Sequence, residues 1–316
     1  MNQTNPNESV MQSPRDVYHM DKARVRASFD RAAKTYDASA ILQKTVRDEM
    51  LSRLDLVKLS PQTILDMGCG TGHASLALAK HFKKAQVVSL DIAMGMIKKA
   101  QNLSATQQLK KLLGISQQKY LCADIEHLPL AENSVGLLWS NLAIQWCNDL
   151  DLVFTEAQRI LQPEGLLMFS TFGPDTLKEL RAATNAARNN GKNNESVSVS
   201  RFIDMHDIGD ALVRAGFSAP VMDVERYTLT YDDVMSVMRD LKSIGAHNAA
   251  DGRSRGLQGK QFLKSLTEYY EQFRLGDKAQ GGKLPATFEV VYGHAWKAAP
   301  KNKLDNSVSP ITFRAR

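Results

Sequence analysis

The pattern of apolar and polar positions first indicates a helical region near the start of the chain. Between residues 17 and 60, apolar side chains recur at helical spacing and form one stripe: Val25, Phe29, Ala32 and Tyr36. Residues 1–16 ahead of this region are rich in Asn, Gln, Ser and Pro, a composition that favours disorder. The pattern therefore predicts a disordered N-terminus followed by a helical cap.

The pattern then changes to short β-rich runs that alternate with helical runs over residues 61–173. The predicted strands are residues 63–67, 86–90, 119–123, 135–140 and 166–172. The predicted helices between them are residues 73–81, 93–103 and 151–161. Strands that are separated by helices favour a mostly parallel sheet covered on both faces. This region is therefore predicted to be an α/β core.

The alternation loosens over residues 174–296. Helices are predicted at 175–188, 207–215, 232–244 and 258–273, and strands at 221–229 and 288–292. We interpret the two helices between the last two strands as a lid inserted at the edge of the sheet. The polar stretches 104–118 and 189–200 are interpreted as insertions, and residues 297–316 as a flexible tail.

The composition narrows the functional classes. A net charge of +6 over 316 residues is too mild to identify a nucleic-acid binder, although it suits an acidic partner. No run approaches the ~18 apolar residues of a membrane span, and the first residues lack the features of a signal peptide. Cys69, Cys122 and Cys147 have no C-x-x-C spacing, which disfavours both a disulfide framework and a zinc site. We expect a reduced cytoplasmic protein without a metal.

The strongest local signal is ILDMGCGTGHAS, residues 64–75. Asp66 lies near the end of a predicted strand, and Gly68, Gly70 and Gly72 follow at alternate positions. Glycines allow a tight turn and let a ligand approach the backbone. The spacing differs from the dinucleotide G-x-G-x-x-G, and the Lys-Ser/Thr pair of a phosphate loop is missing. An acidic residue at this place suits a cationic ligand, although a plain glycine turn is the alternative.

Two further carboxylates end the next two predicted strands. Asp91 is placed to accept both hydrogen bonds of a ribose diol, or alternatively to cap the following helix. Asp124 could accept from an adenine amino group, while Ile125 packs on the ring and Met94 covers its other face. Ile92, next to Asp91, belongs to the same predicted set. Carboxylates at neighbouring strand ends predict a nucleotide-like cofactor in one crevice.

These residues, taken in order, resemble the class I S-adenosylmethionine-dependent methyltransferases over about residues 63–172. A narrower resemblance covers nearly the whole chain. The segments that carry it are SFDRAAKTYD (28–37), SNLAIQWC (140–147), FSTFGPDTLKEL (169–180), RFIDMHDIGDALVRAGF (201–217) and MRDLKSIGAHN (238–248). Together they are similar to the malonyl-[acyl-carrier protein] O-methyltransferases of biotin biosynthesis.

This resemblance implies a Rossmann-like, seven-stranded, mostly parallel sheet with N-terminal helices and a helical lid. It implies S-adenosyl-L-methionine as cofactor and S-adenosyl-L-homocysteine as product. The reaction implied is methyl transfer to the free carboxylate of malonyl-acyl carrier protein or malonyl-CoA, which primes pimeloyl synthesis for biotin. The implied partner is an acyl carrier protein, with neither nucleic acid nor membrane involved, and the enzyme would be a monomer or weak oligomer.

The implied chemistry sets what the site must contain. A carboxylate with a pKa near ~4 is already ionised at neutral pH, so no general base is required. The malonyl end still needs a cation, preferably arginine. The substrate-binding candidates are Tyr36, Asn141, Trp146, Arg201, Arg239, Lys242 and His247, with Asn141 also expected to touch the cofactor. Each cation could instead be a solvated surface charge, and the aromatic residues could simply pack in the core.

Exposed cations could steer an acidic carrier protein by long-range attraction. The candidates are the pairs at 98–99 and 110–111 and the group Arg253, Arg255 and Lys260. Three other functions stay open at this point. The chain also resembles the arginine hydroxylase that assembles mitochondrial complex I, although GAHN at 245–248 and the missing transit peptide favour the malonyl enzyme. A nucleic-acid methyltransferase and a non-catalytic scaffold are the others.

Overall fold

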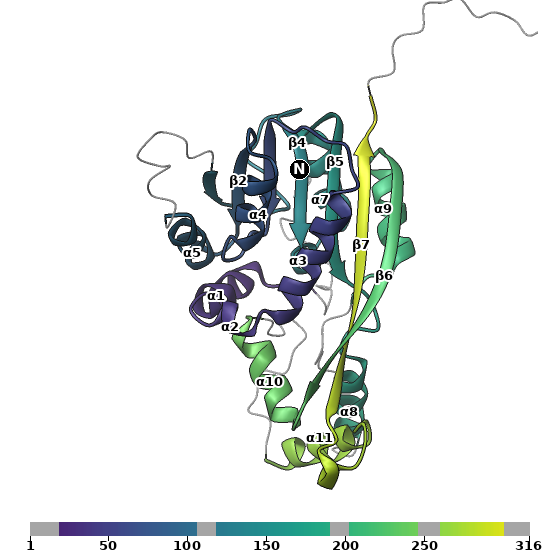
Figure 1. Cartoon of the computed structure of the whole chain (residues 1–316). Coiled ribbons are helices and arrows are strands. Elements are labelled where there is room, and N and C mark those ends of the chain that lie inside the picture. Colours follow the sequence, from purple (N-terminus) through teal and green to yellow (C-terminus); the bar gives the residue numbers. More distant parts are fainter. Residues whose placement is uncertain (1–18, 106–117, 190–201, 246–259, 300–316) are drawn as a thin grey trace, which may run out of the picture.

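Seven strands form one sheet in a computed structural model that describes residues 19–105, 118–189, 202–245 and 260–299 (Figure 1). The strands are β1 (Thr63–Met67), β2 (Gln86–Asp91), β3 (Gln118–Cys122), β4 (Val135–Asn141), β5 (Leu161–Phe172), β6 (Phe217–Tyr231) and β7 (Leu284–Lys297). Their order is β3-β2-β1-β4-β5-β7-β6. The first five strands pair in parallel, whereas β7 runs antiparallel to both β5 and β6. The predicted seven-stranded, mostly parallel α/β fold is confirmed.

Helices cover both faces of this sheet. They are α1 (Lys22–Ala32), α2 (Tyr36–Ser39), α3 (Ile41–Leu54), α4 (His73–His81), α5 (Met94–Ala105), α7 (Leu150–Ile160), α8 (Lys178–Asn189), α9 (Met205–Arg214), α10 (Val234–Ser243) and α11 (Lys260–Glu271), with short 3₁₀ turns at Ile144–Trp146 (η1) and Lys278–Gln280 (η2). On one face, Met50 of α3 and Trp139 of β4 belong to one buried cluster. On the other, Phe154 of α7 packs against Phe169 of β5 in a second cluster. Burial of both faces is what the continuous apolar runs of the central strands require.

The central and edge strands differ in how their side chains are buried. In β1, four consecutive residues from Ile64 to Met67 are buried, because helices cover both faces of a central strand. In β6, buried or half-buried positions alternate with exposed ones along most of the strand, as expected for an edge strand with one face in solvent. The predicted bounds of β1 to β4 match within one residue, whereas β5 begins five residues earlier than predicted and β6 and β7 are longer than predicted.

The last two strands extend beyond the rest of the sheet as a ribbon. β7 pairs with β5 only from Val290 to Trp296, but it pairs with β6 along its whole length from Leu284. Helices α8 and α11 pack on each other at the far end of this ribbon (Figure 1). Of the two helices predicted to form a lid, α11 packs on α8, whereas α10 contacts α2 and β6.

Helix α10 is joined to the N-terminal helices by side chains that bond to its final turn. Ser28 Oγ donates to the carbonyl oxygen of Gly245 at 3.0 Å, and Thr35 Oγ1 donates to that of Ser243 at 3.1 Å. Gly245 has a φ of +75°, and a Cβ there would lie 3.0 Å from the ring of Phe29. Helix α10 thus lies against the N-terminal helices α1 and α2 (Figure 1).

Candidate functional site

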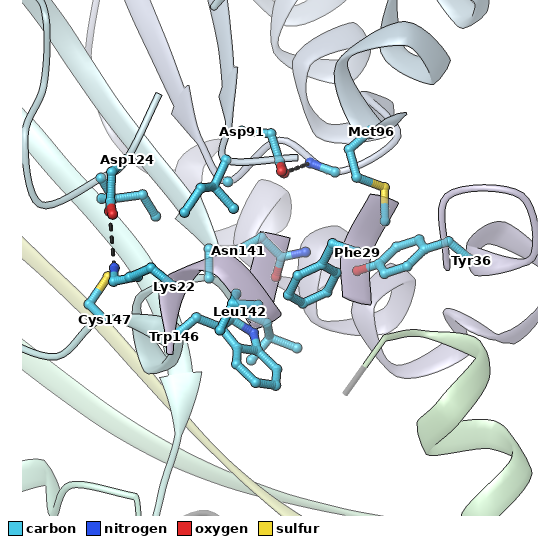
Figure 2. Close-up of a pocket in the computed structure, with 16 residues that line it drawn as sticks. Lys22, Phe29, Tyr36, Asp91, Met96, Asp124, Asn141, Leu142, Trp146 and Cys147 are labelled. Carbon is cyan, nitrogen blue, oxygen red and sulfur yellow. Dashed lines mark hydrogen bonds and ion pairs between the residues drawn. The ribbon is translucent and has the colours of Figure 1, made fainter. Parts of the chain in front are cut away.

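A pocket of about 570 Å³ lies where β1, β2 and β4 end, beneath α1 and α2 (Figure 2). We call it the strand-end pocket. The predicted site residues that line it are Tyr36, Gly68, Gly70, Asp91, Ile92, Asp124, Ile125, Asn141 and Trp146. The pocket therefore brings together side chains from both the predicted cofactor set and the predicted substrate set.

The three glycines of the turn after β1 have different roles. All have a positive φ, of +76° at Gly68, +53° at Gly70 and +90° at Gly72. A Cβ on Gly68 would lie 2.2 Å from Cβ of Ala143, and one on Gly72 would lie 2.7 Å from Cβ of Ala100. These two glycines permit close packing, and Gly72 does not line the pocket. At Gly70 the nearest atom would be 3.9 Å away, so its backbone is open to a ligand.

Asp91 is held by backbone amides at the edge of the pocket. Its Oδ2 accepts from the N–H of Gly70 at 2.9 Å, and its Oδ1 accepts from that of Ala93 at 2.8 Å. Burial raises the pKa of Asp91 to about 6, although both amides act in the opposite direction. Each carboxylate oxygen keeps a further lone pair, so capping the chain at Ala93 leaves acceptors for a ligand hydroxyl.

Asp124 is contacted by a cation that sequence reasoning missed. Lys22 Nζ lies 3.0 Å from Oδ1 of Asp124 and 2.9 Å from Oε2 of Glu126 (Figure 2). Burial alone would lower the pKa of Lys22, but the surrounding anionic groups outweigh it and raise that pKa. Just before α1, the backbone N–H of Met20 donates to Oδ1 of Asn148, whose Nδ2 donates back to the Met20 carbonyl oxygen. These contacts fasten α1 across the pocket.

Aromatic and sulfur side chains form the roof of the pocket. The rings of Phe29 and Trp146 meet edge to face, with centroids 5.2 Å apart, and Tyr36 lies beside Phe29 (Figure 2). Met94 was predicted to cover the adenine, but it is 46% exposed and lies outside the lining. Met96 lines the pocket instead, because α5 begins at Met94 and its inward face starts two residues later. The prediction for Met94 is corrected accordingly.

Asp66 lines a second space, which we call the side cavity, of about 1200 Å³. Tyr36, Gly68, Gly70 and Asn141 line both spaces, so they form a common wall. Asp66 accepts a hydrogen bond from Ser75 Oγ at 2.5 Å, and burial raises its pKa to about 7. The structure therefore places this carboxylate beside the strand-end pocket, not in it.

Asn141 connects the common wall to the surrounding elements. Its Nδ2 donates to the carbonyl oxygen of Gln43 in α3 at 3.0 Å, and its Oδ1 accepts from Ser170 Oγ at 3.0 Å. Both ends of its amide are therefore bonded to protein. This residue positions α3 against β4 and β5 as well as lining both spaces.

The predicted malonyl-binding cations do not gather at the pocket. Arg239 and Lys242 lie on the exposed side of α10, because Val234 and Val237 take the buried side. The Arg239 guanidinium donates to Ser236 Oγ in its own helix at 2.9 Å. Arg201 and His247 lie outside the described residues. So do the steering candidates at 110–111, 253 and 255, while the pair at 98–99 and Lys260 are exposed.

Two further findings concern the described ranges only. None of the helices there is long and apolar enough to cross a membrane. No group of three or more His, Cys, Asp or Glu side chains in those ranges is arranged to hold a metal ion.

Comparison with known proteins gives close relatives along nearly the whole chain. Residues 65–169 match the family described as "Methyltransferase domain". The malonyl-[acyl-carrier protein] O-methyltransferase of Methylovorus sp. (strain MP688) is 63% identical over 301 residues, covering 95% of this chain and 97% of that protein. The protein of the same name from Gallionella capsiferriformans (strain ES-2) is 53% identical over 288 residues, covering 91% and 95%.

A solved structure supports the fold alone. The YcgJ protein from Bacillus subtilis superimposes with a TM-score of 0.52 at 15% identity, covering 83% of this chain and 98% of that one. The curated relatives decide the family, because their identity is high and extends beyond the methyltransferase domain into both ends of the described chain. This chain belongs to the malonyl-[acyl-carrier protein] O-methyltransferase family.

Proposed function

We propose that this protein transfers a methyl group from S-adenosylmethionine to the free carboxylate of malonyl-acyl carrier protein, in the cytoplasm. The product would be the malonyl methyl ester that primes pimeloyl synthesis for biotin. As a member of its family, the chain is an S-adenosylmethionine-dependent methyltransferase. The observation that carries the proposal is 63% identity over 95% of the chain to an enzyme of this name.

The strand-end pocket fits the adenosyl part of this cofactor. Gly70 leaves space where a Cβ would otherwise stand, and Asp91 presents carboxylate oxygens at the same turn. We assign Asp91 to the ribose hydroxyls, Asp124 to the adenine amino group and Ile125 to the ring face. When bound, the cofactor supplies an electrophilic methyl group on a sulfonium.

The chain's own residues hold and shield the reactants. Lys22, bound to Asp124, keeps α1 over the pocket and restricts the entry of water. A drier site strengthens the attraction between a carboxylate and a sulfonium. The malonyl carboxylate is already ionised, so no protein group needs to remove a proton. Burial raises the pKa of the pocket thiol Cys147 to about 12, so this thiol is not a nucleophile at neutral pH.

The acyl carrier protein would be the partner that delivers the malonyl group. Support comes from the substrate named for the relatives and from the net charge of +6 on this chain. A positively charged surface attracts an acidic carrier over distances longer than direct contact. We propose that the enzyme acts as a monomer or weak oligomer.

A direct assay tests the proposed function. The protein is incubated with methyl-labelled S-adenosylmethionine and malonyl-acyl carrier protein, malonyl-CoA, or acetyl-acyl carrier protein as a control that lacks the free carboxylate. We expect a base-labile methyl ester with a malonyl thioester and none with the acetyl control. Absence of ester with both malonyl thioesters, despite binding of the methyl donor measured by calorimetry, would favour a binding scaffold instead.

A further inference from the structure

A third cavity adjoins the strand-end pocket at η1. We call it the η1 cavity, and it has a volume of about 1510 Å³. Ile144 and Gln145 of η1 line it, whereas Trp146 lines the strand-end pocket. Cys147, the next residue, lines both, and Gln145 Nε2 donates to the carbonyl oxygen of Leu142 at 2.7 Å. The two spaces therefore meet at this one short, braced segment.

Arg181, near the start of α8, brings a positive charge to the η1 cavity. Its side chain lines the cavity, and the residue is half-buried. Its Nη1 donates to the carbonyl oxygen of Pro174 at 2.8 Å, and its Nη2 donates to that of Thr176 at 2.9 Å. A guanidinium has five N–H donors, so these two bonds hold the group in place and leave other donors for a ligand.

No carboxylate among the described residues pairs with Arg181, whose two bonded partners are neutral. Asp204 and Asp207 also line the cavity, but both are exposed. Asp204 accepts from the backbone N–H of His206 and lies 2.8 Å from the ring of that residue instead. A half-buried cation without an acidic partner favours an anionic ligand, because its charge is only partly solvated.

The cations of the other two spaces differ from Arg181. Lys22 in the strand-end pocket and Arg47 in the side cavity both bind carboxylates. Lys44, the other lysine or arginine of the side cavity, is exposed and therefore solvated. Of the described lysines and arginines that line the three spaces, Arg181 is the one that is half-buried and lacks a carboxylate partner.

The rest of the η1 cavity suits an uncharged chain that would carry the anion. The rings of Phe172 and Phe202 meet edge to face, with centroids 5.5 Å apart, and both residues line the cavity. Asn148 and Thr171 add an amide and a hydroxyl group to the lining. The thioester arm of a carrier protein likewise combines methylene groups with amides, so its chemistry matches this wall.

We propose that Arg181 binds the free carboxylate of the malonyl thioester, whose arm lies in the η1 cavity. This inference rests on the proposed function, because malonyl is then the group that the acyl carrier protein delivers. One carboxylate oxygen accepts from the guanidinium. The other forms a bond to the methyl carbon as the methyl–sulfur bond breaks, and the electron pair of that bond stays on sulfur. The ester product has lost the negative charge, so Arg181 selects the substrate over the product.

Calorimetry on protein saturated with S-adenosylhomocysteine tests the proposal without turnover. The two ligands are malonyl-acyl carrier protein and the carrier protein loaded with the malonyl methyl ester, and both carry the phosphate of the arm. In Arg181→Gln, we expect the Kd of the malonyl form to rise at least about tenfold, as for a lost charged hydrogen bond, and that of the ester to stay unchanged. Arg181→Lys keeps the charge and should recover part of the affinity. Lys178→Gln, an exposed charge change in the same helix outside the three spaces, is the matched control and should alter neither Kd.

Four results would overturn the proposal. Equal weakening of both ligands in Arg181→Gln would assign the guanidinium to the phosphate of the arm, and an unchanged Kd for both would remove it from the site. A raised Kd of S-adenosylhomocysteine in the same variant would mean that Arg181 acts by shaping the cofactor site. Loss of the preference for the malonyl form in Lys44→Gln but not in Arg181→Gln would place the carboxylate in the side cavity. The proposed function fails separately, if the unaltered protein forms no methyl ester in the direct assay.

Discussion

Lys22 Nζ binds both Asp124 and Glu126, at 3.0 and 2.9 Å, so the first turn of α1 is fastened to the chain that follows β3. The three side chains are 23%, 25% and 9% exposed, which makes this a partly shielded bridge across 102 residues of sequence. Val25 and Phe29 of α1 line the pocket. By fixing the first turn of α1, the ion pairs of Lys22 hold these two side chains over the pocket.

Lys22→Gln is expected to speed the release of S-adenosylhomocysteine roughly fivefold, since a partly exposed ion pair contributes about 1 kcal/mol. Stopped-flow measurement of ligand release gives this rate. Lys83→Gln removes an exposed positive charge between α4 and β2 and should leave the rate unchanged. Equal rates in the unaltered protein and in Lys22→Gln would mean that the bridge does not retain the ligand.

Asp91→Ala is expected to weaken cofactor binding by about 1–3 kcal/mol, the free energy of hydrogen bonds to a buried charged acceptor. Because burial raises the pKa of Asp91 to about 6, affinity should also fall as the pH is lowered through that value. Calorimetry with S-adenosylhomocysteine between pH 5 and 8 measures both effects. An unchanged Kd in Asp91→Ala would remove this residue from the site.

Asp66 is expected to make the free protein more stable in mild acid. Its pKa is raised from 3.8 to about 7 by burial, so the folded chain holds a proton that the unfolded chain has lost. This contribution is present below pH 3.8 and is lost as the pH rises through about 7. Between pH 5.5 and 8, the unfolding free energy should fall by about 2 kcal/mol more in the unaltered protein than in Asp66→Asn. Urea unfolding of both proteins measures the difference, and parallel pH profiles would contradict it.

Gly68→Ala is expected to destabilise the protein by about 2–5 kcal/mol, from a strained positive φ together with the overlap of two Cβ atoms. Adding Ala143→Gly removes the overlapping Cβ and should leave only about 1–2 kcal/mol of backbone strain. Gly70→Ala, where the added Cβ finds space, should show a loss of similar size to this double variant. Urea denaturation compares the three, and a double variant no more stable than Gly68→Ala would refute the packing explanation.

The sequence predicts the central part of the fold because its signals there are local. Strands β1 and β2 are short apolar runs with a carboxylate as the last residue or the one before it, and their predicted bounds differ from the observed ones by at most one residue. Edge strands carry a weaker signal. Residues such as Asp223 and Arg226 are exposed in β6, and their charges hide the length of the strand when only hydrophobicity is considered.

Tyr36 and Trp146 were predicted from the segments that carry the family resemblance, whereas other site residues could be predicted from their place at or just after a strand end. Asp91 and Gly70 are of this kind. Lys22 is not, because its partner Asp124 lies far away in the sequence and no motif links them. Met94 and Arg239 show a different limit. Helical spacing shows which residues share a face, but not what each face packs against, and both of these side chains are exposed in the folded chain.

The position of β7 between β5 and β6 has a consequence for how the chain is synthesised. Strand β6 leaves the ribosome before its neighbour β7, and the sheet order gives β6 no other neighbour. The ring of Phe169 in β5 packs against Gly293 of β7, where an added Cβ would lie 2.3 Å from that ring. Phe169 therefore cannot make this contact until β7 is present. Translation must therefore reach nearly residue 297 before this half of the sheet can assemble. A nascent chain that stops before Leu284 would lose an internal strand and leave two unpaired edges open to aggregation.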